Sequence, residues 1–586
     1  MKTSRILSYL LSSSIALVTM TGCMDDPVPT SGATQEQIEQ ASKDGLANAI
    51  TKYINTGSNS SYSDIGYPQQ MIYRDVMIAD MPIKDPSYYY FMDYLEPLYI
   101  GDYQLQTDFW QRYYYLIKKC NICVGACSDS SEDALNLATG LVYRALAYLD
   151  LARWYEFHDS GVAAIDNDAA SKGIKGLTVP IVTENTTEQQ AFANPRAPFY
   201  EMYRFILTDL NRAERAMSKV SETPEINKPS LATIYGMKAR LWLEIATRFR
   251  DYPEDLAEQI ANDNVSYENV LGPGYALDPL GVTSANDAYR QTIVNAQKVI
   301  DSGATPMTED EWHSVTSGFN TPTSAWLLAI LMSSSDVMVT SNTWKSWVSF
   351  MAPEAKYGVS STEYGAQHMI DKTLYEAMSD NDWRKRTWID PELFEAAASD
   401  ESVFTDNYSH LTSMSYDEWL NNAPYVGFKF RPGAGERNSA TTGNKVAIPL
   451  MRVEEMYFIL AEAKGNLNGV GTGVAALNSF MNTYRYTEAT YSCVAGSLED
   501  FTEELIKQKR IELWGEGLSL WDIRRLRMAV TRGYEGTNHL ERFRYNSEKG
   551  YVPGWSTMFI PRRENDLNSQ CKLNPDPSSK FTLWVE

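Results

Sequence analysis

Apolar residues recur at helical spacing along most of this chain, and runs that alternate like strands are scarce. Residues at i, i+3, i+4 and i+7 share one face of an α-helix, so each such stripe predicts a helix packed against a neighbour. The clearest stripes are Leu141, Ala145, Tyr148, Leu149 and Ala152; Tyr203, Ile206, Leu207, Leu210, Ala213 and Met217; Leu231, Ile234, Tyr235, Ala239, Trp242 and Leu243; and Tyr289, Ile293, Ala296 and Ile300. Ser302 and Gly303 predict the end of the last of these helices. The sequence therefore predicts an all-α fold.

The first 23 residues read as an export signal that ends at a lipidated cysteine. Lys2 and Arg5 precede a short apolar run from Ile6 to Met20, and Thr21-Gly22-Cys23 supplies small residues before a cysteine. The apolar run is too short to span a membrane. We expect residues 1–22 to be removed and Cys23 to carry acyl chains, since each buried methylene adds about 0.8 kcal/mol of membrane affinity. The alternative is an ordinary signal peptide with an incidental cysteine, and Met20 stands where lipoproteins usually have Leu.

Length and charge limit the classes of partner. A chain of 586 residues with 44% hydrophobic residues can bury a large core. Its formal net charge of −23 argues against nucleic acid and anionic membrane surfaces as partners, because both require positive patches. No second apolar run is long enough for a membrane span. The expected attachment to a membrane is through lipid alone.

Several motifs, in a fixed order, carry a family resemblance. The run AIPLMRVEEMYFILAEAKGNLNG begins at residue 447 and has a helical stripe, and LIKQKRIELWGEGLSLWDIRRLR follows it. GLTVPIVTE, PRAPFYEMYRFILTDLNRAERAM and KPSLATIYGMKARLWLEIA precede them, and FIPRRENDLN ends the series near residue 568. Together these motifs resemble the RagB/SusD family of outer-membrane nutrient-binding lipoproteins. Two acidic residues just after Cys23, Asp25 and Asp26, also resemble the signal that sends such lipoproteins to the cell surface.

The resemblance implies a fold and a domain plan. Small Ala or Gly residues beside large Tyr or Leu residues resemble tetratricopeptide helix pairs, and the family builds about four such pairs into one scaffold with long loop insertions. We expect the signal peptide at residues 1–22 and a single SusD-like domain at 23–586. Its expected parts are an N-terminal part at 24–300, a variable insertion region at 301–450 and a C-terminal RagB/SusD part at 451–586.

The run CNICVGAC allows two interpretations. Thiolates of Cys120, Cys123 and Cys127 could converge on a metal, but the segment lacks a nearby fourth ligand. They also lie on the same stripe as Tyr113 and Leu116, and a free cysteine packs as a small hydrophobe. We expect core cysteines, with no metal and no cofactor.

Two aromatic-rich regions are the candidate ligand sites. Residues 71–103 hold many Tyr and Asp residues, and residues 303–450 hold seven of the fourteen Trp residues of the chain, interleaved with polar residues. A sugar offers apolar C–H faces and a girdle of hydroxyls, so its site needs flat aromatic platforms beside polar groups. Core packing is the alternative for any one of these rings. The candidate pool is Asp80, Tyr88, Tyr90, Tyr94, Trp326, Trp344, Trp347 and Tyr357.

Catalytic motifs are missing from the sequence. HExxH, GxSxG and Walker A runs are absent, and the five histidines show no ligand spacing. The glycine-rich run at 469–473 follows a predicted helix and not a strand, so we expect a flexible turn between helices and not a phosphate loop. Glu512, Glu516 and Asp522 could serve a glycosidase, but flanking Arg510, Arg524 and Arg525 favour a structural ion-pair network.

The sequence thus predicts a non-enzymatic surface lipoprotein that binds an oligosaccharide. By resemblance, its partner is a SusC-like TonB-dependent outer-membrane transporter, over which it sits as a lid. Three alternatives stay open: a peptide-binding lid of a similar importer, a surface glycoside hydrolase, and an assembly scaffold without a small ligand.

Overall fold

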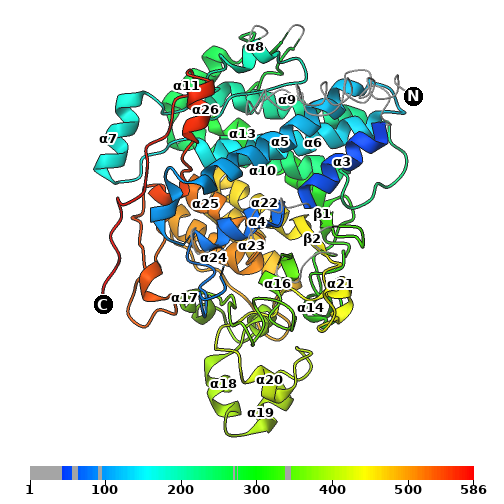
Figure 1. The fold of residues 1–586 in the computed structure, drawn as a ribbon, viewed down its shortest axis with the longest axis vertical. Helices are drawn as coiled ribbons and strands as arrows, with labels where there is room; N and C mark the ends of the chain where they lie inside the picture. The colour runs from blue at the N-terminus through cyan, green and yellow to red at the C-terminus, as the bar shows by residue number, and fades with distance from the viewer. Residues whose placement is uncertain are drawn as a thin grey trace, which may run out of the picture.

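The computed structural model describes residues 43–55, 64–89, 91, 95–267, 271–272, 275–336, 339 and 345–586. The predicted signal peptide and Cys23 lie outside the described residues. Helices dominate the part that is described, and its only sheet has two strands. The all-α prediction is confirmed (Figure 1).

The first half of the chain forms the long helices of the scaffold. They are α3 (Lys43–Asn55), α4 (Tyr67–Val76), η2 (Pro97–Ile100), α5 (Gln104–Ala126), α6 (Ala134–Tyr155), α7 (Ala163–Lys172), α8 (Glu188–Ala191), α9 (Phe199–Met217), α10 (Leu231–Asp251), α11 (Pro253–Asn262) and α13 (Ala285–Ile300). All four stripes identified in the sequence lie within α6, α9, α10 and α13. Hydrophobic periodicity therefore located the helices of the scaffold correctly.

The second half alternates short irregular elements with a C-terminal group of helices. The elements are α14 (Glu309–His313), β1 (Trp326–Leu331), α16 (Trp347–Met351), α17 (Lys372–Glu376), η3 (Trp383–Thr387), α18 (Pro391–Ala397), α19 (Glu401–Asn407), α20 (Tyr416–Trp419), η4 (Gly433–Gly435), α21 (Ala440–Gly443), β2 (Ala447–Arg452), α22 (Val453–Asn468), α23 (Val470–Tyr484), α24 (Leu498–Glu512), α25 (Ser519–Leu526), η5 (Glu541–Phe543), η6 (Gly554–Ser556) and α26 (Arg562–Leu567).

The long helices pack in succession. α5 contacts α6, α6 contacts α9, α10 contacts α13, α13 contacts α22, and α22 contacts α23 (Figure 1). Capping boxes fix where some of them begin: the hydroxyl of Ser230 accepts from the Thr233 N–H at the start of α10, and Ser497 does the same with Asp500 at α24. The order of contacts in space thus follows the order of the helices along the chain.

The two strands close a long insertion. β1 and β2 pair antiparallel, with Trp326 opposite Arg452 and Leu331 opposite Ala447. Residues 332–446 therefore leave the scaffold and return to it at neighbouring strands.

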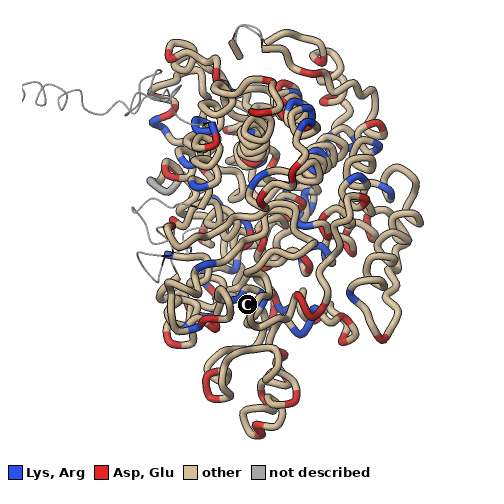
Figure 2. The backbone as a smooth tube through the Cα atoms, turned by 90° about the vertical axis from the view of Figure 1, so that its right-hand side faces the viewer, with Lys and Arg blue, Asp and Glu red and all other residues tan. Residues whose placement is uncertain are grey.

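Part of this insertion forms a small lobe with its own core. The lobe comprises residues 387–428 and carries α18, α19 and α20, which project at the bottom of the views in Figures 1 and 2. Trp419 is fully buried at its centre, against Phe394, Phe404 and Tyr408. The lobe core is separate from the main core.

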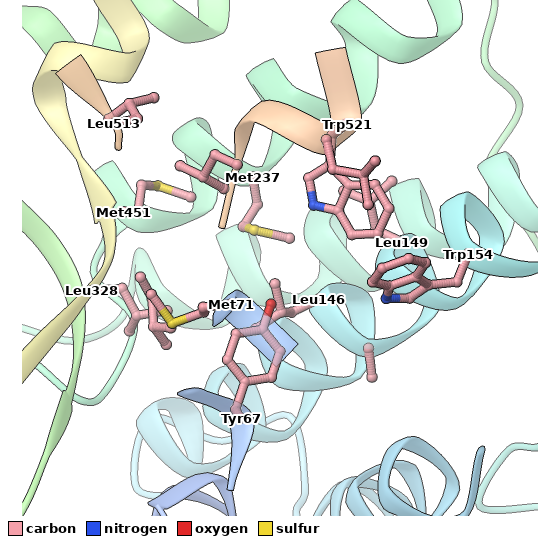
Figure 3. Packing of buried hydrophobic residues seen from close by; sticks show 14 of the residues in the cluster. Tyr67, Met71, Leu146, Leu149, Trp154, Met237, Leu328, Met451, Leu513 and Trp521 are labelled. Carbon is pink, nitrogen blue, oxygen red and sulfur yellow. The ribbon is translucent and has the colours of Figure 1, made fainter. Parts of the chain in front are cut away.

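The main core lies where the helical scaffold meets the strands and the C-terminal helices. Figure 3 shows Met71 of α4, Met237 of α10 and Met451 of β2 converging on one apolar region. Trp154 and Trp521 pack edge to face there, with ring centroids 5.0 Å apart. The family-like motif around Trp521 is therefore part of the core.

A buried ion-pair network joins β2 to the C-terminal helices. Four cations and four carboxylates balance in it: Arg384, Lys429, Arg452, Arg485, Asp382, Glu454, Glu512 and Glu516. Arg452 Nη1 lies 2.7 Å from Glu454 and its Nη2 lies 2.8 Å from Glu516. Burial acts to raise the pKa of Glu512, but Arg485, Arg384 and Arg452 hold this pKa below its ordinary value.

Glu512 and Glu516 lie in a buried ion-pair network, as expected, but none of their partners is an arginine that the sequence suggested. Of the arginines named in the sequence, Arg525 pairs as expected, with Asp522. Arg510 instead binds Asp80, and Arg524 donates to Ser556. These partners come from distant parts of the chain, which helix spacing alone does not reveal.

The expected flexible turn at 469–473 is wrong in extent. Gly469, with φ of +95°, makes the turn, and α23 already begins at Val470. Position 473 lies inside the helix, and glycine suits it because a larger side chain would meet Phe501. A Cβ at this position would lie 2.6 Å from the Phe501 ring. Gly473 thus allows α23 to pack closely against Phe501 of α24.

The cysteines of α5 lie in the core, as expected. Cys120 and Cys123 are fully buried, and Cys127 is partly buried just beyond the end of the helix. Within the described residues, no group of three or more His, Cys, Asp or Glu side chains is arranged to hold a metal ion. Among the described helices, none combines the length and hydrophobicity that a membrane crossing requires.

Glu201 on α9 makes stability depend on pH. Its side chain is 4% exposed, and burial raises its pKa to about 7 from an ordinary 4.5. The folded state therefore binds this proton more tightly than the unfolded state does. The stability that proton binding contributes is fully present below pH 4.5 and is lost as the pH rises to 7. We expect Glu201→Gln, which stays neutral, to raise the free energy of unfolding by on the order of 2 kcal/mol at pH 8. Urea denaturation measures the gain.

The gain should vanish well below pH 4.5, where the acid is neutral in both the folded and the unfolded state. The exposed Glu222 provides a control, and Glu222→Gln should change little at either pH. An equal gain for Glu201→Gln at both pH values would contradict the assignment.

Candidate ligand-binding site

Two segments far apart in sequence meet at one surface. Ile83 pairs antiparallel with His368, and the Lys84 N–H donates to the Gln367 carbonyl at 2.9 Å. The Met369 N–H donates to the Pro82 carbonyl at 2.8 Å. Segment 79–89 of the first aromatic region thus lies against segment 357–369 of the second.

A buried hydrogen bond supports this junction from below. The Tyr89 hydroxyl lies 2.8 Å from His368 Nε2, and the two rings meet edge to face. Burial lowers the pKa of His368 to about 4, so the imidazole is neutral at physiological pH. Its role here is to fix the position of the two segments.

Two tyrosines form an aromatic platform above the junction. Tyr88 is 42% exposed and Tyr364 is partly exposed, and their rings meet edge to face with centroids 5.3 Å apart. The Tyr89 N–H donates to the Pro86 carbonyl and closes the turn that carries Tyr88. An exposed pair of rings on a fixed turn can receive the apolar face of a sugar without reorganising.

The Asp85 side chain lies beside Gly365 at the other side of the platform. Gly365 has φ of +74°, which favours glycine, and a Cβ there would lie 3.6 Å from Asp85 Cβ. The carboxylate of Asp85 accepts the Ser87 N–H at 2.8 Å, which stabilises the preceding turn. Asp85 and Tyr364 therefore lie near one another, and both supply polar atoms beside the rings.

Asp80 is a core residue, against the expectation that it contacts ligand. It is fully buried, and its Oδ1 accepts from Arg510 at 2.5 Å. Its backbone carbonyl accepts from Trp514 Nε1 at 2.8 Å. Asp80 instead ties segment 79–89 to the C-terminal helices.

The tryptophan enrichment of the insertion has a packing explanation. All six described tryptophans of residues 303–450 are at most 4% exposed: Trp312, Trp326, Trp347, Trp383, Trp388 and Trp419. Trp326 lies in β1, and Trp347 packs on Phe430 with centroids 5.0 Å apart. The expectation that Trp326 and Trp347 present faces to a ligand is wrong because both rings lie inside the core.

The remaining candidates divide between partly buried and undescribed positions. Tyr357 is partly buried, packs against the main core and has its pKa raised by burial. Tyr90, Tyr94 and Trp344 lie outside the described residues. Tyr88 is thus the exposed member of the described candidates. The sequence interpretation missed Tyr364. The local feature that could have indicated an exposed ring there is a tyrosine followed by a glycine in a polar segment.

An internal cavity elsewhere does not fit a sugar. It lies between α6, α9, α10 and α25 and has a volume of about 40 Å³. That is space for only a few water molecules, far below a ligand pocket of several hundred Å³. Its charged lining is internally paired: Arg153 binds Glu244 at 2.8 Å and Arg248 binds Glu156 at 2.7 Å.

Solved structures share this fold. A SusD-like carbohydrate-binding protein from Bacteroides vulgatus is 20% identical and has a TM-score of 0.63, over 90% of this chain and 96% of that chain. A putative sugar-binding protein from Bacteroides vulgatus is 18% identical with a TM-score of 0.59, over 93% and 99%. A SusD superfamily protein from Bacteroides thetaiotaomicron is 17% identical with a TM-score of 0.57, over 91% and 99%. No curated protein matches the chain.

Two family models match the sequence over most of its length. The model described as "SusD family" matches residues 283–572. The model described as "Starch-binding associating with outer membrane" matches residues 35–243. Both models describe SusD proteins and together they cover both halves of the chain, so the chain belongs to the SusD/RagB family.

Proposed function

We propose that this protein is a cell-surface lipoprotein that binds an oligosaccharide nutrient and passes it to a SusC-like TonB-dependent transporter. The observation that carries the proposal is the exposed Tyr88–Tyr364 platform, built where the two candidate regions of the sequence meet. The family description, starch binding with association to the outer membrane, supports a glycan as the ligand class and the outer membrane as the location. The protein would act by binding alone.

The lipid anchor and the transporter complete this proposal. Acyl chains on Cys23 would keep the protein in the same membrane as the transporter, so a weakly bound glycan would remain at high local concentration. Affinity purification of the acylated protein from outer membranes should recover a TonB-dependent barrel. A Cys23→Ser variant should lose both lipid and barrel, whereas recovery of the barrel without lipid would separate the two parts of the proposal.

Substitution of the platform tests glycan binding. We expect Tyr88→Ala or Tyr364→Ala to weaken affinity for a glycan roughly tenfold, since each removes one aromatic contact. A glycan array identifies the ligand, and titration calorimetry measures the affinities. The matched control is Tyr115→Ala on α5, which removes a ring that is 41% exposed and lies outside both platform segments.

Peptides belong in the same screen. If the screen finds a bound peptide and no bound glycan, the ligand class is peptides. A glycan hit with equal affinity for the wild-type protein and both platform variants would remove the platform from the site. Release of reducing ends from a bound glycan would show that the protein hydrolyses glycans, and the proposed function of binding alone would be wrong.

A further inference from the structure

The lobe at residues 387–428 is acidic throughout. It contains no Lys or Arg residue, and Figure 2 shows red but no blue positions along it. Its carboxylates are Asp390, Glu392, Glu395, Asp400, Glu401, Asp406, Asp417 and Glu418. A folded unit of this size with charges of one sign creates a negative field around itself.

Only some of these carboxylates have partners. Asp390 and Asp400 cap the N-termini of α18 and α19, and Glu418 pairs with Lys356 and Arg437. The others are Glu392, Glu395, Glu401, Asp406 and Asp417, which are exposed and make no ion pair with any described residue. Their charges are therefore not compensated by neighbouring side chains.

The lobe lies next to the tyrosine platform. Lys84 Nζ donates to the Asn421 carbonyl at 2.8 Å, and Gln367 Nε2 donates to Asn422 Oδ1 at 2.7 Å. Lys84 is four residues before Tyr88, and Gln367 is three residues after Tyr364. The base of the lobe thus contacts the same two segments that carry the rings.

The platform segments themselves add negative charge. Glu363 is exposed on them, and Asp85 is partly exposed. Lys84 is the only Lys or Arg among residues 79–89, 357–369 and 387–428, and its ammonium contacts the Asn421 carbonyl. A carboxylate or sulfate on a bound sugar would find no arginine there to pair with.

From this arrangement we propose that the site selects uncharged or amine-bearing oligosaccharides and rejects those with uronate or sulfate groups. The inference rests on the proposed function, because it assigns a ligand class to the same platform. Apolar C–H faces would stack on Tyr88 and Tyr364, and the field of Asp85, Glu363 and the lobe would repel anions. Salt screens this repulsion, with a screening length of about 8 Å at physiological ionic strength, so the selectivity should weaken as salt is added.

A paired glycan screen tests the selectivity on the full acylated chain in detergent. The probe pairs are oligogalactose with oligogalacturonate, dextran with dextran sulfate, and chitin oligomers with chitosan oligomers. We expect each bound neutral probe to bind at least tenfold more tightly than its anionic counterpart at low salt. Chitosan oligomers should bind at least as tightly as chitin oligomers.

Neutralising the lobe tests the cause. The triple variant Glu401→Gln, Asp406→Asn, Asp417→Asn should reduce the discrimination against anionic probes several-fold and flatten its salt dependence. A matched control with the same change of charge is Glu222→Gln, Glu254→Gln, Glu258→Gln, at exposed positions outside the lobe. Circular dichroism establishes that both variants are folded.

The outcomes separate this inference from the proposed function. An anionic glycan bound as tightly as its neutral partner would overturn the charge selection and leave glycan binding intact. Equal discrimination in the lobe variant and the control would also overturn it. The absence of binding to every glycan would overturn the proposed function, and the charge selection with it.

Discussion

Arg452→Met is expected to lower the free energy of unfolding by about 3–5 kcal/mol, the cost of removing one partner from a buried ion pair. Arg452 is fully buried at the end of β2 and contacts Glu454, Glu512 and Glu516. Methionine is of similar length but carries no charge, so three buried carboxylates lose a shared cation. Those carboxylates cannot reach water without disrupting β2 and α22. Urea denaturation followed by tryptophan fluorescence measures the change.

The control for this substitution is a surface ion pair. Arg290 is 60% exposed and pairs with Asp287 on α13 at 2.6 Å. Arg290→Met should change the free energy of unfolding by less than about 1 kcal/mol, because water solvates both groups when the pair is broken. Similar losses for the two variants would mean that the buried network contributes no more than a surface pair.

Gly517→Ala is expected to prevent normal folding or to cost several kcal/mol, through a clash with helix backbone. Gly517 is buried with φ of +70°, and an added Cβ would lie 2.5 Å from Met71 Cα and 2.7 Å from the Met71 carbonyl oxygen. Met71 lies within α4, so its backbone cannot rotate away as a side chain could. The Gly517 N–H also donates to Asp75 at 2.8 Å, which holds the loop in place. Soluble yield and thermal unfolding of the purified variant test the prediction.

A second glycine separates the clash from the backbone strain. Gly281 has φ of +66°, and an added Cβ would meet no atom within 4 Å. Gly281→Ala therefore carries only the strain of a left-handed alanine, about 1–2 kcal/mol. If Gly517→Ala were no more destabilising than Gly281→Ala, the close approach of α4 would be irrelevant to stability.

The helical scaffold could be predicted because its signal is local. The stripes of α6 and α10 lie within about twenty residues each, and Ser230 marks the start of α10 through a capping box. Such signals locate a helix from nearby residues, without knowledge of what it packs against. The interpretation of Cys120 and Cys123 as core residues succeeded for the same reason, since they share a stripe with apolar residues.

The candidate site could not be read from the sequence because its parts are far apart along the chain. Tyr88 and Tyr364 are 276 positions apart, and the residues near either one do not indicate that the two rings meet. Asp80 looked like a ligand-binding carboxylate because Arg510, its buried partner, is 430 positions away. Trp347 stood in a polar, irregular segment that resembles a surface loop, yet its ring packs on Phe430. In long insertions, tertiary contacts override local polarity.

The pairing of β1 with β2 has a consequence for how this protein can diversify. Adjacent strands lie about 5 Å apart, so the insertion enters and leaves the scaffold across that small gap whatever its length. New binding specificities can therefore arise by exchange of residues 332–446 while the helices stay unchanged. Any exchanged segment must still supply part of the buried ion-pair network. In this chain Asp382, Arg384 and Lys429 come from that segment, and they balance Arg452, Arg485 and the glutamates of the scaffold. A transplanted insertion that lacks them would leave three buried glutamates, Glu454, Glu512 and Glu516, to be balanced by Arg452 and Arg485 alone.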